Sequence, residues 1–324
     1  MASRFRWTPL LRLLLGLALV ALLVRSVGLD NLRSALAPLS SHPGWIAAAL
    51  ALTYAALLAG AVRWQAILHA LGLPTPFSST YRGFFIGQFF NAFLFGACGG
   101  DLARAIVAAR DHPGKRTEAV TSVFLDRAIG LVVTLLAGCA LLLPRLRDVA
   151  AFEDARPALL LMAAFLLAAV AFATLFFTRD LFDRLPFLQR LERRGRLGPL
   201  LRRAYDAIYL FRKNARHLLG PALLSLANLL LLAAASAALA RALELDLPFR
   251  DLLAVFPVIT VLAAIPLTPG SLGVRETLYI QLLAPFGVPP GPPLMLSLLG
   301  YLAASAWSLY GAFFLLRQPR SNHD

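Results

Sequence analysis

EAVTSVFLDRAIGLVVTLLAGCALLL, residues 118–143, is an apolar run long enough to cross a bilayer, and it carries Asp126 and Arg127 in its first half. About 20 apolar residues span the hydrocarbon core as a helix. The two charged residues lie roughly 13 Å along the helix axis, near the middle of the hydrocarbon. Each such charge costs about 2.5–3.5 kcal/mol on insertion scales. The run therefore predicts a transmembrane helix, and Asp126 and Arg127 within it are candidate functional residues.

The whole chain has the composition of a membrane protein. Of its 324 residues, 59% are hydrophobic and 15% are charged, whereas about 25% of a typical soluble domain is charged. No segment alternates with the period of a barrel strand. We therefore predict an all-α, polytopic transmembrane helix bundle that forms a single integral membrane domain over residues 1–324. Five further apolar runs are predicted to cross fully: 8–25, 44–68, 157–178, 218–243 and 293–316.

Two of these spans carry flanking residues that need interpretation. Arginines precede the apolar run Leu13–Val24 in the manner of a signal peptide. The nearest Ala-x-Ala lies well beyond that run and is followed by Pro38, so we expect an uncleaved first span. Arg63-Trp64 stands near the end of the run 44–68, where we expect it to anchor the helix at the membrane interface.

Two apolar regions are interrupted and do not form single long runs. Residues 78–97 are rich in Phe and Gly and precede a short helix expected at 101–110. Residues 252–266 and 271–286 are two half-length pieces separated by Pro269-Gly270. Because proline breaks a helix and glycine permits close backbone approach, both regions are predicted to be re-entrant or broken helices.

Loop charges set the predicted topology. The segment 179–216 is strongly basic, so the positive-inside rule places it in the cytoplasm together with both termini. A full crossing by 78–97 would put that segment outside, whereas a return to the same side removes the conflict. The same reasoning applied to 252–286 gives six full spans and two re-entrant elements that enter from opposite faces. This pattern suggests an inverted repeat with halves 44–143 and 218–316.

The first interrupted region ends in a charged motif. Asp101 and Arg104 are three residues apart and share one helix face. Gly99-Gly100 immediately precede them, and we expect this break to leave backbone N–H groups at a helix start, where anions such as phosphate bind. The alternative is a plain cytoplasmic helix in which Asp101 is the N-cap and Arg104 snorkels.

The other intramembrane charges also have two interpretations. Asp126 and Arg127 do not face each other on a helix, so each needs a partner in the bundle or on a ligand; the alternative is a purely structural interhelical ion pair. Arg275-Glu276 follow the break at Pro269, Gly270 and Gly273; the alternative there is an exterior turn. Asn91, in the Phe-rich segment, is expected to satisfy broken backbone groups rather than to bind substrate.

Several function classes are not supported by any motif. The net charge of +14 has no basic soluble domain behind it, so we expect no nucleic-acid partner. The two cysteines and five histidines lack ligand spacing, so we predict no metal and no cofactor. No nucleotide-binding loop is present. The basic segment 179–216 is expected to lie as an amphipathic helix on anionic lipid.

The order of these motifs resembles that of a known family, the lysylphosphatidylglycerol synthase transmembrane region, also called flippase-like. The resemblance covers about 45–316. Its motifs are Arg63-Trp64, Asn91, Gly99-Gly100-Asp101-x-x-Arg104, Asp126-Arg127 and Thr268-Pro269-Gly270-x-x-Gly273-x-Arg275-Glu276. The chain departs from the family pattern at Phe95–Cys98, where proline is frequent, and at Ser271, where a second glycine is usual. The full synthases add an aminoacyl-transferase domain, which we do not expect here.

The resemblance implies lipid translocation across the bacterial inner membrane and a non-enzymatic role. The expected partner is a lipid with a charged headgroup. Arg104 and Arg275 would contact its phosphate, Asp126 and Arg127 would form a step at the midplane, and Asp101 and Glu276 would neutralise the arginines of the empty site. Two alternatives stay open: a membrane-embedded enzyme that modifies a lipid headgroup, and an accessory subunit of a separately encoded lipid synthase.

Overall fold

The protein is a bundle of helices, and no strand occurs in the part of the chain that the structure describes. This structure is a computed structural model that describes residues 36–94, 96–178, 216–265 and 271–316, with single positions 25, 30 and 268. Three predictions lie outside these residues: nearly all of the span 8–25, the basic segment 179–216 apart from Arg216, and the Pro269-Gly270 break.

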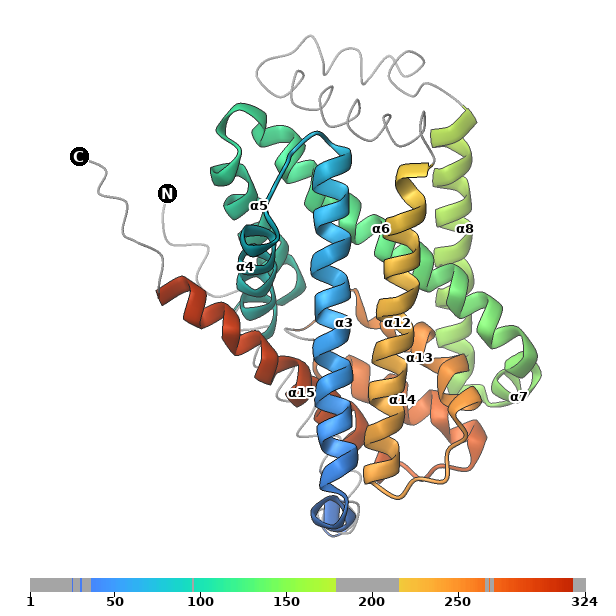
Figure 1. Cartoon of the computed structure of the whole chain (residues 1–324). Coiled ribbons are helices and arrows are strands. Elements are labelled where there is room, and N and C mark those ends of the chain that lie inside the picture. The colour runs from blue at the N-terminus through green and yellow to red at the C-terminus, as the bar shows by residue number, and fades with distance from the viewer. Residues whose placement is uncertain are drawn as a thin grey trace, which may run out of the picture.

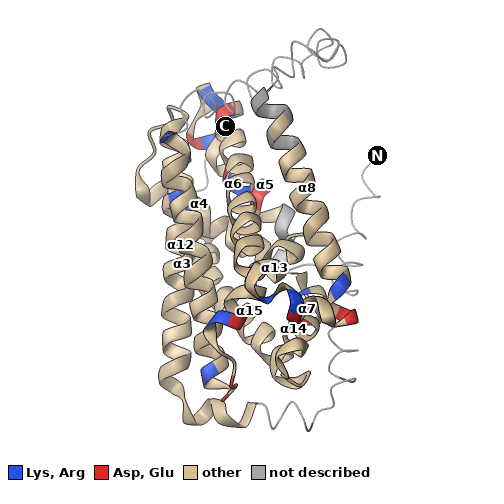
Figure 2. Cartoon of the chain, turned by 90° about the vertical axis from the view of Figure 1, so that its right-hand side faces the viewer, with Lys and Arg blue, Asp and Glu red and all other residues tan. Residues whose placement is uncertain are grey.

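The chain is a multi-pass membrane protein. Five helices in the described residues are long and apolar enough to cross a bilayer. Each one begins and ends within two residues of a predicted run: α3 (Pro43–Ala70), α6 (Arg116–Leu142), α8 (Arg156–Thr178), α12 (Arg216–Ala242) and α15 (Gly291–Leu316). Figure 2 shows long uncharged stretches on these helices, with charged residues gathered near helix ends and beside α5, α6 and α14. The predicted all-α polytopic bundle is confirmed.

The first interrupted region folds as a hairpin between α3 and α6. It consists of α4 (Phe77–Phe89), a π-helical turn η2 (Phe90–Leu94) and α5 (Gly96–Asp111). Its two ends meet, because Lys115 Nζ donates to the carbonyl oxygen of Gly72 at 3.0 Å. Thr75 Oγ1 and His112 Nε2 also lie 3.2 Å apart. The hairpin therefore returns to the end of the bundle from which it starts, as the loop charges predicted.

The second interrupted region forms the equivalent hairpin between α12 and α15. It comprises α13 (Phe249–Ala263), α14 (Val274–Leu283) and a 3-10 turn η7 (Ala284–Phe286). Gly273, the N-cap of α14, has φ +85°, a conformation that glycine adopts without a steric penalty. The expected break at Gly273 is thus present.

The two hairpins start from opposite ends of the bundle (Figure 1). α13 begins beside the α6–α8 connection, where Arg145 and Asp251 form an ion pair at 2.8 Å. At the start of α3, His42 contacts Glu244, just after α12, at 2.9 Å. The 28-residue α3 separates this end of the bundle from Gly72 by about 40 Å.

Short helical turns complete the described connections. The segment between α6 and α8 is built from η4, α7 and η5, while η1 precedes α3 and η3 precedes α6. Their bounds are Leu143–Arg145, Leu146–Ala151, Glu153–Ala155, Ala37–Ser41 and Pro113–Lys115.

Each hairpin packs against a helix from the other half of the chain. α4 lies along α15, where Gly311 approaches the main chain of Phe85. α13 lies along α6, where Gly138 faces Pro257. α3 and α12 lie side by side along their length (Figure 1), and Asn228 Nδ2 donates to the carbonyl oxygen of Ala56 at 2.6 Å. Because α15 runs antiparallel to α4, its last turns end beside the start of α4, with the rings of Tyr81 and Phe314 5.8 Å apart.

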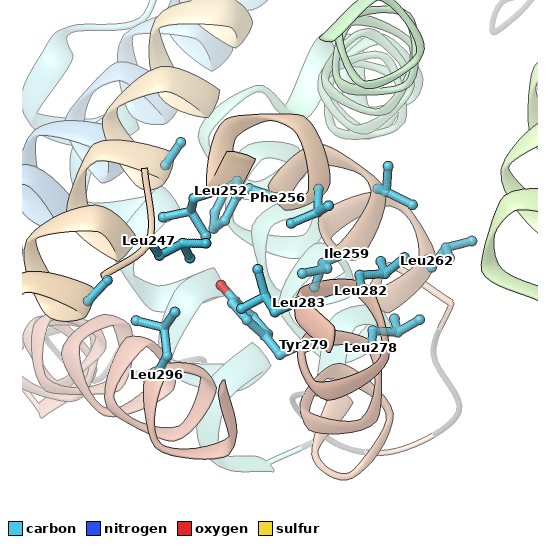
Figure 3. Packing of buried hydrophobic residues seen from close by; sticks show 14 of the residues in the cluster. Leu247, Leu252, Phe256, Ile259, Leu262, Leu278, Tyr279, Leu282, Leu283 and Leu296 are labelled. Carbon is cyan, nitrogen blue, oxygen red and sulfur yellow. The ribbon is translucent and has the colours of Figure 1, made fainter. Parts of the chain in front are cut away.

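The second hairpin forms the centre of the larger hydrophobic core. Figure 3 shows side chains of α13 and α14 interdigitating and facing Leu296 of α15. The largest fully buried side chains of these helices are Leu252, Ile259, Leu282, Leu283, Leu294 and Leu296. A second core packs around Trp64 between α3, α4, α5 and α6. Both hairpins are therefore held inside the protein, where irregular backbone at membrane depth is tolerated.

The arrangement of the ends is testable by labelling single cysteines. Gly44 and Gly114 are exposed, and an added Cβ at either position meets nothing within 4 Å. In a background with Cys98 and Cys139 replaced by alanine, we expect an impermeant maleimide to reach Gly44→Cys and Gly114→Cys from opposite sides of the membrane. Labelling of both from one side would contradict the hairpin topology.

Candidate functional site

Asp126 is the centre of a buried charged cluster. Its carboxylate accepts from Arg63 Nε at 2.7 Å through one oxygen and from Arg104 Nη2 at 2.9 Å through the other. Only 1% of the Asp126 side chain is exposed, against 13% for Arg63 and 6% for Arg104. Three helices, α3, α5 and α6, therefore meet at one carboxylate.

Aromatic rings hold the Arg104 guanidinium in place. Its central carbon lies 4.3 Å from the ring centre of Trp64 and 5.0 Å from that of Phe84. Trp64 is fixed in turn, because its Nε1 donates to Ser122 Oγ at 3.0 Å. A cation over an indole face is stabilised by the ring quadrupole, more strongly where water is excluded. The rings and the carboxylate together make the burial of Arg104 tolerable.

A second ion pair continues the cluster toward the surface. Arg127 Nε donates to Asp101 Oδ2 at 2.7 Å. Asp101 Oδ1 lies 4.0 Å from Arg104 Nη1, so Asp101 stands between the two arginines. We refer to Arg63, Arg104, Arg127, Asp101 and Asp126 as the first cluster. With three arginines and two aspartates, its formal charge is +1.

The prediction that Asp126 and Arg127 point in different directions is confirmed. Asp126 faces the interior and pairs with α3 and α5, whereas 45% of the Arg127 side chain is exposed. Both find partners on other helices, as their adjacent positions required.

The sequence interpretation of Arg63-Trp64 as an interface anchor is wrong. Trp64 is 2% exposed, and Arg63 pairs with Asp126 while its Nη1 also donates to Ser225 on α12 at 3.0 Å. The signal that could have identified Arg63 was its place in an apolar run opposite the unpaired Asp126. The spacing alone could not choose this partner, because it depends on how α3 and α6 pack.

The role predicted for Gly99 and Gly100 also needs correction. α5 begins at Gly96, so both glycines lie within the helix and do not form the break. The N–H of Gly100 is occupied, because it donates to Asn91 Oδ1 at 3.0 Å. Asp101 is consequently no N-cap. Asn91 serves the backbone, as expected, and Arg104 is buried and not snorkelling.

Gly100 is required because the hairpin is tightly closed. A Cβ at this position would collide with the Asn91 side chain and with the carbonyl oxygen of Gly87. Gly87 in turn packs against the stem of Arg104. The close approach of α4 and α5 thus places Arg104 under the rings and against Asp126.

We expect Gly100→Ala to destabilise the protein by about 1–3 kcal/mol, because backbone must shift to admit the methyl group. The measurement is unfolding of the purified protein in mixed detergent micelles. Gly114→Ala is the matched control, since an added Cβ there contacts nothing. Equal stability of the two variants would show that the hairpin is not tightly packed.

Arg275 and Glu276 form a second cluster at the start of α14. Glu276 Oε1 accepts from Ser297 Oγ at 2.8 Å and from Arg275 Nη2 at 3.1 Å, and Oε2 accepts from the N–H of Gly273 at 2.5 Å. Arg275 Nε also donates to Ser297 Oγ at 2.8 Å. Glu276 is fully buried and Arg275 is 20% exposed. The hydrogen bonds of both residues to Ser297 hold the break against α15.

Tyr301 connects the second cluster with the first hairpin. Its ring centre lies 5.2 Å from the guanidinium carbon of Arg275. Its hydroxyl donates to the carbonyl oxygen of Ala92, in the π-helical turn, at 2.8 Å. The two hairpin tips are thereby joined through one side chain of α15.

The described residues contain no group of three or more His, Cys, Asp or Glu side chains placed to hold a metal ion. Both clusters consist of paired charges: arginines that can bind an anion and carboxylates that neutralise them. Arg–phosphate contacts are among the strongest hydrogen bonds in proteins.

We expect Asp126→Asn to destabilise the fold by about 3–5 kcal/mol, because it leaves Arg63 in the interior without a counter-ion and Arg104 with only Asp101, at 4.0 Å. Asp148→Asn, at an exposed pair with Arg145, should change stability by about 1 kcal/mol or less. Both variants are compared by unfolding in mixed micelles. A stable Asp126→Asn protein would mean that Asp126 is not the structural centre of the cluster.

A comparison with protein families identifies a match over most of the chain. The model described as "Lysylphosphatidylglycerol synthase TM region" covers residues 10–310, most of the chain. No curated protein matches the chain.

Proposed function

The chain belongs to the lysylphosphatidylglycerol synthase TM region family, and we propose that it moves a lipid between the leaflets of the bacterial inner membrane. Family membership indicates a function related to membrane lipids. The finer assignment rests on one observation: a buried charged cluster with a formal charge of +1 that reaches an exposed face of a membrane span.

The charge excess favours binding of an anionic group. A buried charge is costly unless it is paired, and the two carboxylates of the first cluster cannot neutralise all three arginines. A phosphate group that carries one negative charge would make the site neutral. Arg104 would contact that phosphate, Asp126 and Arg127 would form the step at membrane depth, and Asp101 would neutralise the arginines when the site is empty.

The second cluster would contribute from the opposite side. Arg275 would contact the phosphate there, and Glu276 already neutralises it in the empty state, at 3.1 Å. Tyr301 would couple this site to the first hairpin through its contacts with Arg275 and Ala92. Movement of one hairpin tip is then transmitted to the other.

An inverted repeat would explain the arrangement, with halves 44–143 and 218–316. Each half contains a span, a hairpin and a second span, and each hairpin packs on the second span of the other half. Ser122 follows Asp101 by the same number of residues as Ser297 follows Glu276. Inverted repeats support alternating access around a central site.

This proposal places both termini and the segment 179–216 in the cytoplasm, with that segment resting on anionic headgroups. Lys115, Arg116 and Arg216 lie on helix ends of the same side. On the other side, Arg145 and Arg156 are balanced by Asp148, Glu153 and Asp251. This asymmetry follows the positive-inside rule.

The test is lipid scrambling in proteoliposomes that contain fluorescent phospholipids with several headgroups. We expect the purified protein to exceed empty liposomes without added nucleotide, and Arg104→Gln to be slower by about tenfold or more, the loss expected for one charge-assisted contact. Arg145→Gln, at an ion pair outside both clusters, should retain the wild-type rate.

Folding of each variant is verified by size-exclusion chromatography before reconstitution. A wild-type rate equal to that of empty liposomes for every headgroup would reject the proposal. Loss of a lipid species from a deletion strain, without a change in leaflet distribution, would favour a headgroup-modifying enzyme instead.

A further inference from the structure

We propose that Asp101 is an exchangeable counter-ion, which leaves Arg127 for Arg104 when the phosphodiester of a membrane lipid enters the first cluster sideways between α5 and α6. This inference rests on the proposed function and specifies the lipid group, its route and the residue that responds to it.

The first cluster forms a graded path from an exposed face to the interior. The exposed fraction falls from 45% at Arg127 to 23% at Asp101, and then to 6% at Arg104 and 1% at Asp126. Consecutive members are in contact or nearly so: Arg127–Asp101 at 2.7 Å, Asp101–Arg104 at 4.0 Å and Arg104–Asp126 at 2.9 Å. An anion that contacts Arg127 therefore lies near a second guanidinium, that of Arg104, with Asp101 between the two arginines.

The exposed end of this path opens on an apolar surface, not on an aqueous loop. On α6, Arg127 shares a helix face with Phe124, 67% exposed, and Leu131, 37% exposed. On α5, Leu102, the residue after Asp101, is 63% exposed. Arg127 lies roughly 17 Å along α6 from Arg116, at the depth of acyl chains. A headgroup can reach it while its acyl chains stay among these apolar residues.

Asp101 has an alternative partner within reach. Its Oδ1 is buried and makes no hydrogen bond, although it lies only 4.0 Å from Arg104 Nη1. Arg104, whose side chain is 6% exposed, also has a buried Nε without a hydrogen-bond partner. A small side-chain rotation would complete the Asp101–Arg104 pair and release Arg127 Nε for the phosphate.

The charge of the cluster selects the ligand class. A phosphodiester carries one negative charge, which neutralises the excess of +1. A phosphomonoester carries about −1.5 to −2 at pH 7 and would leave an excess of negative charge at membrane depth. A lipid without phosphate would leave the excess of +1 unchanged. The geometry therefore favours a diester-linked headgroup.

Native mass spectrometry of the full-length protein in detergent tests the exchange. The probes are phosphatidylglycerol, phosphatidic acid and diacylglycerol with the same acyl chains, and inorganic phosphate alone. We expect phosphatidylglycerol to bind the wild type most tightly. Arg127→Gln should bind it about tenfold more weakly, and Arg127→Lys should restore most of the affinity because the charge is kept.

Asp101→Asn gives the result that separates exchange from a structural ion pair. If Asp101 competes with the lipid for Arg127, its neutralisation should tighten phosphatidylglycerol binding, by about threefold or more. A purely structural pair would instead give weaker binding or a less stable protein. Arg145→Gln, outside both clusters, is the control and should leave the effect of Asp101→Asn in place.

Three results would overturn the inference. The first is that phosphatidylglycerol binds tightly to the wild type and that neither Arg127→Gln nor Asp101→Asn changes this affinity, while both variants still scramble lipid. This result would refute the proposed route but not lipid translocation itself. The second is tighter binding of phosphatidic acid or diacylglycerol than of phosphatidylglycerol. The third is that only the binding of inorganic phosphate depends on Arg127 and Asp101. The phosphate group bound by the cluster would then not come from a lipid.

Discussion

The carboxylate of Asp126 is the constraint on which the first half of the bundle depends. A single charge at this depth would oppose insertion, and the two guanidiniums that neutralise it come from different helices. Arg63 can reach it only if α3 packs against α6, and Arg104 only if α5 turns back from the hairpin tip. The electrostatic requirement therefore selects the fold around it, and the aromatic rings of Trp64 and Phe84 line the remaining side of Arg104.

The two hairpins use different side chains to satisfy their non-helical backbone. Backbone that is not helical at membrane depth needs internal hydrogen bonds. The first hairpin closes through the contact between Asn91 and the tightly packed Gly100. Its charged residues belong to a series of ion pairs that reaches an exposed face of the bundle. The second closes through Glu276, which binds the N–H of Gly273 and the hydroxyl of Ser297, and keeps its charges in a compact neutral pair. The excess positive charge lies in the first cluster, to which α3, α5 and α6 each contribute one arginine.

Stability and function place opposite demands on the first cluster. A fully compensated network would hold the helices together but would offer nothing to an anionic headgroup. The observed cluster has a tightly paired inner part at Asp126 and a looser outer part at Asp101, which stands between two arginines. Under the proposed function, such a division would let a lipid headgroup rearrange the outer pair while the inner pair keeps the bundle intact.

The sequence by itself determined the class of protein and the bounds of the described spans to within two residues. It also showed that Asp126 and Arg127 need separate partners. Apolar length and helical periodicity are local properties, so the sequence carries them directly. Loop charge also determined that each hairpin returns to its own side. Only the tertiary structure decided which arginines meet Asp126, that Arg63 lies inside and not at the interface, and that Gly100 serves packing. These contacts depend on how helices that are distant in the chain pack against one another. The sequence of an apolar run does not specify which helix it packs against.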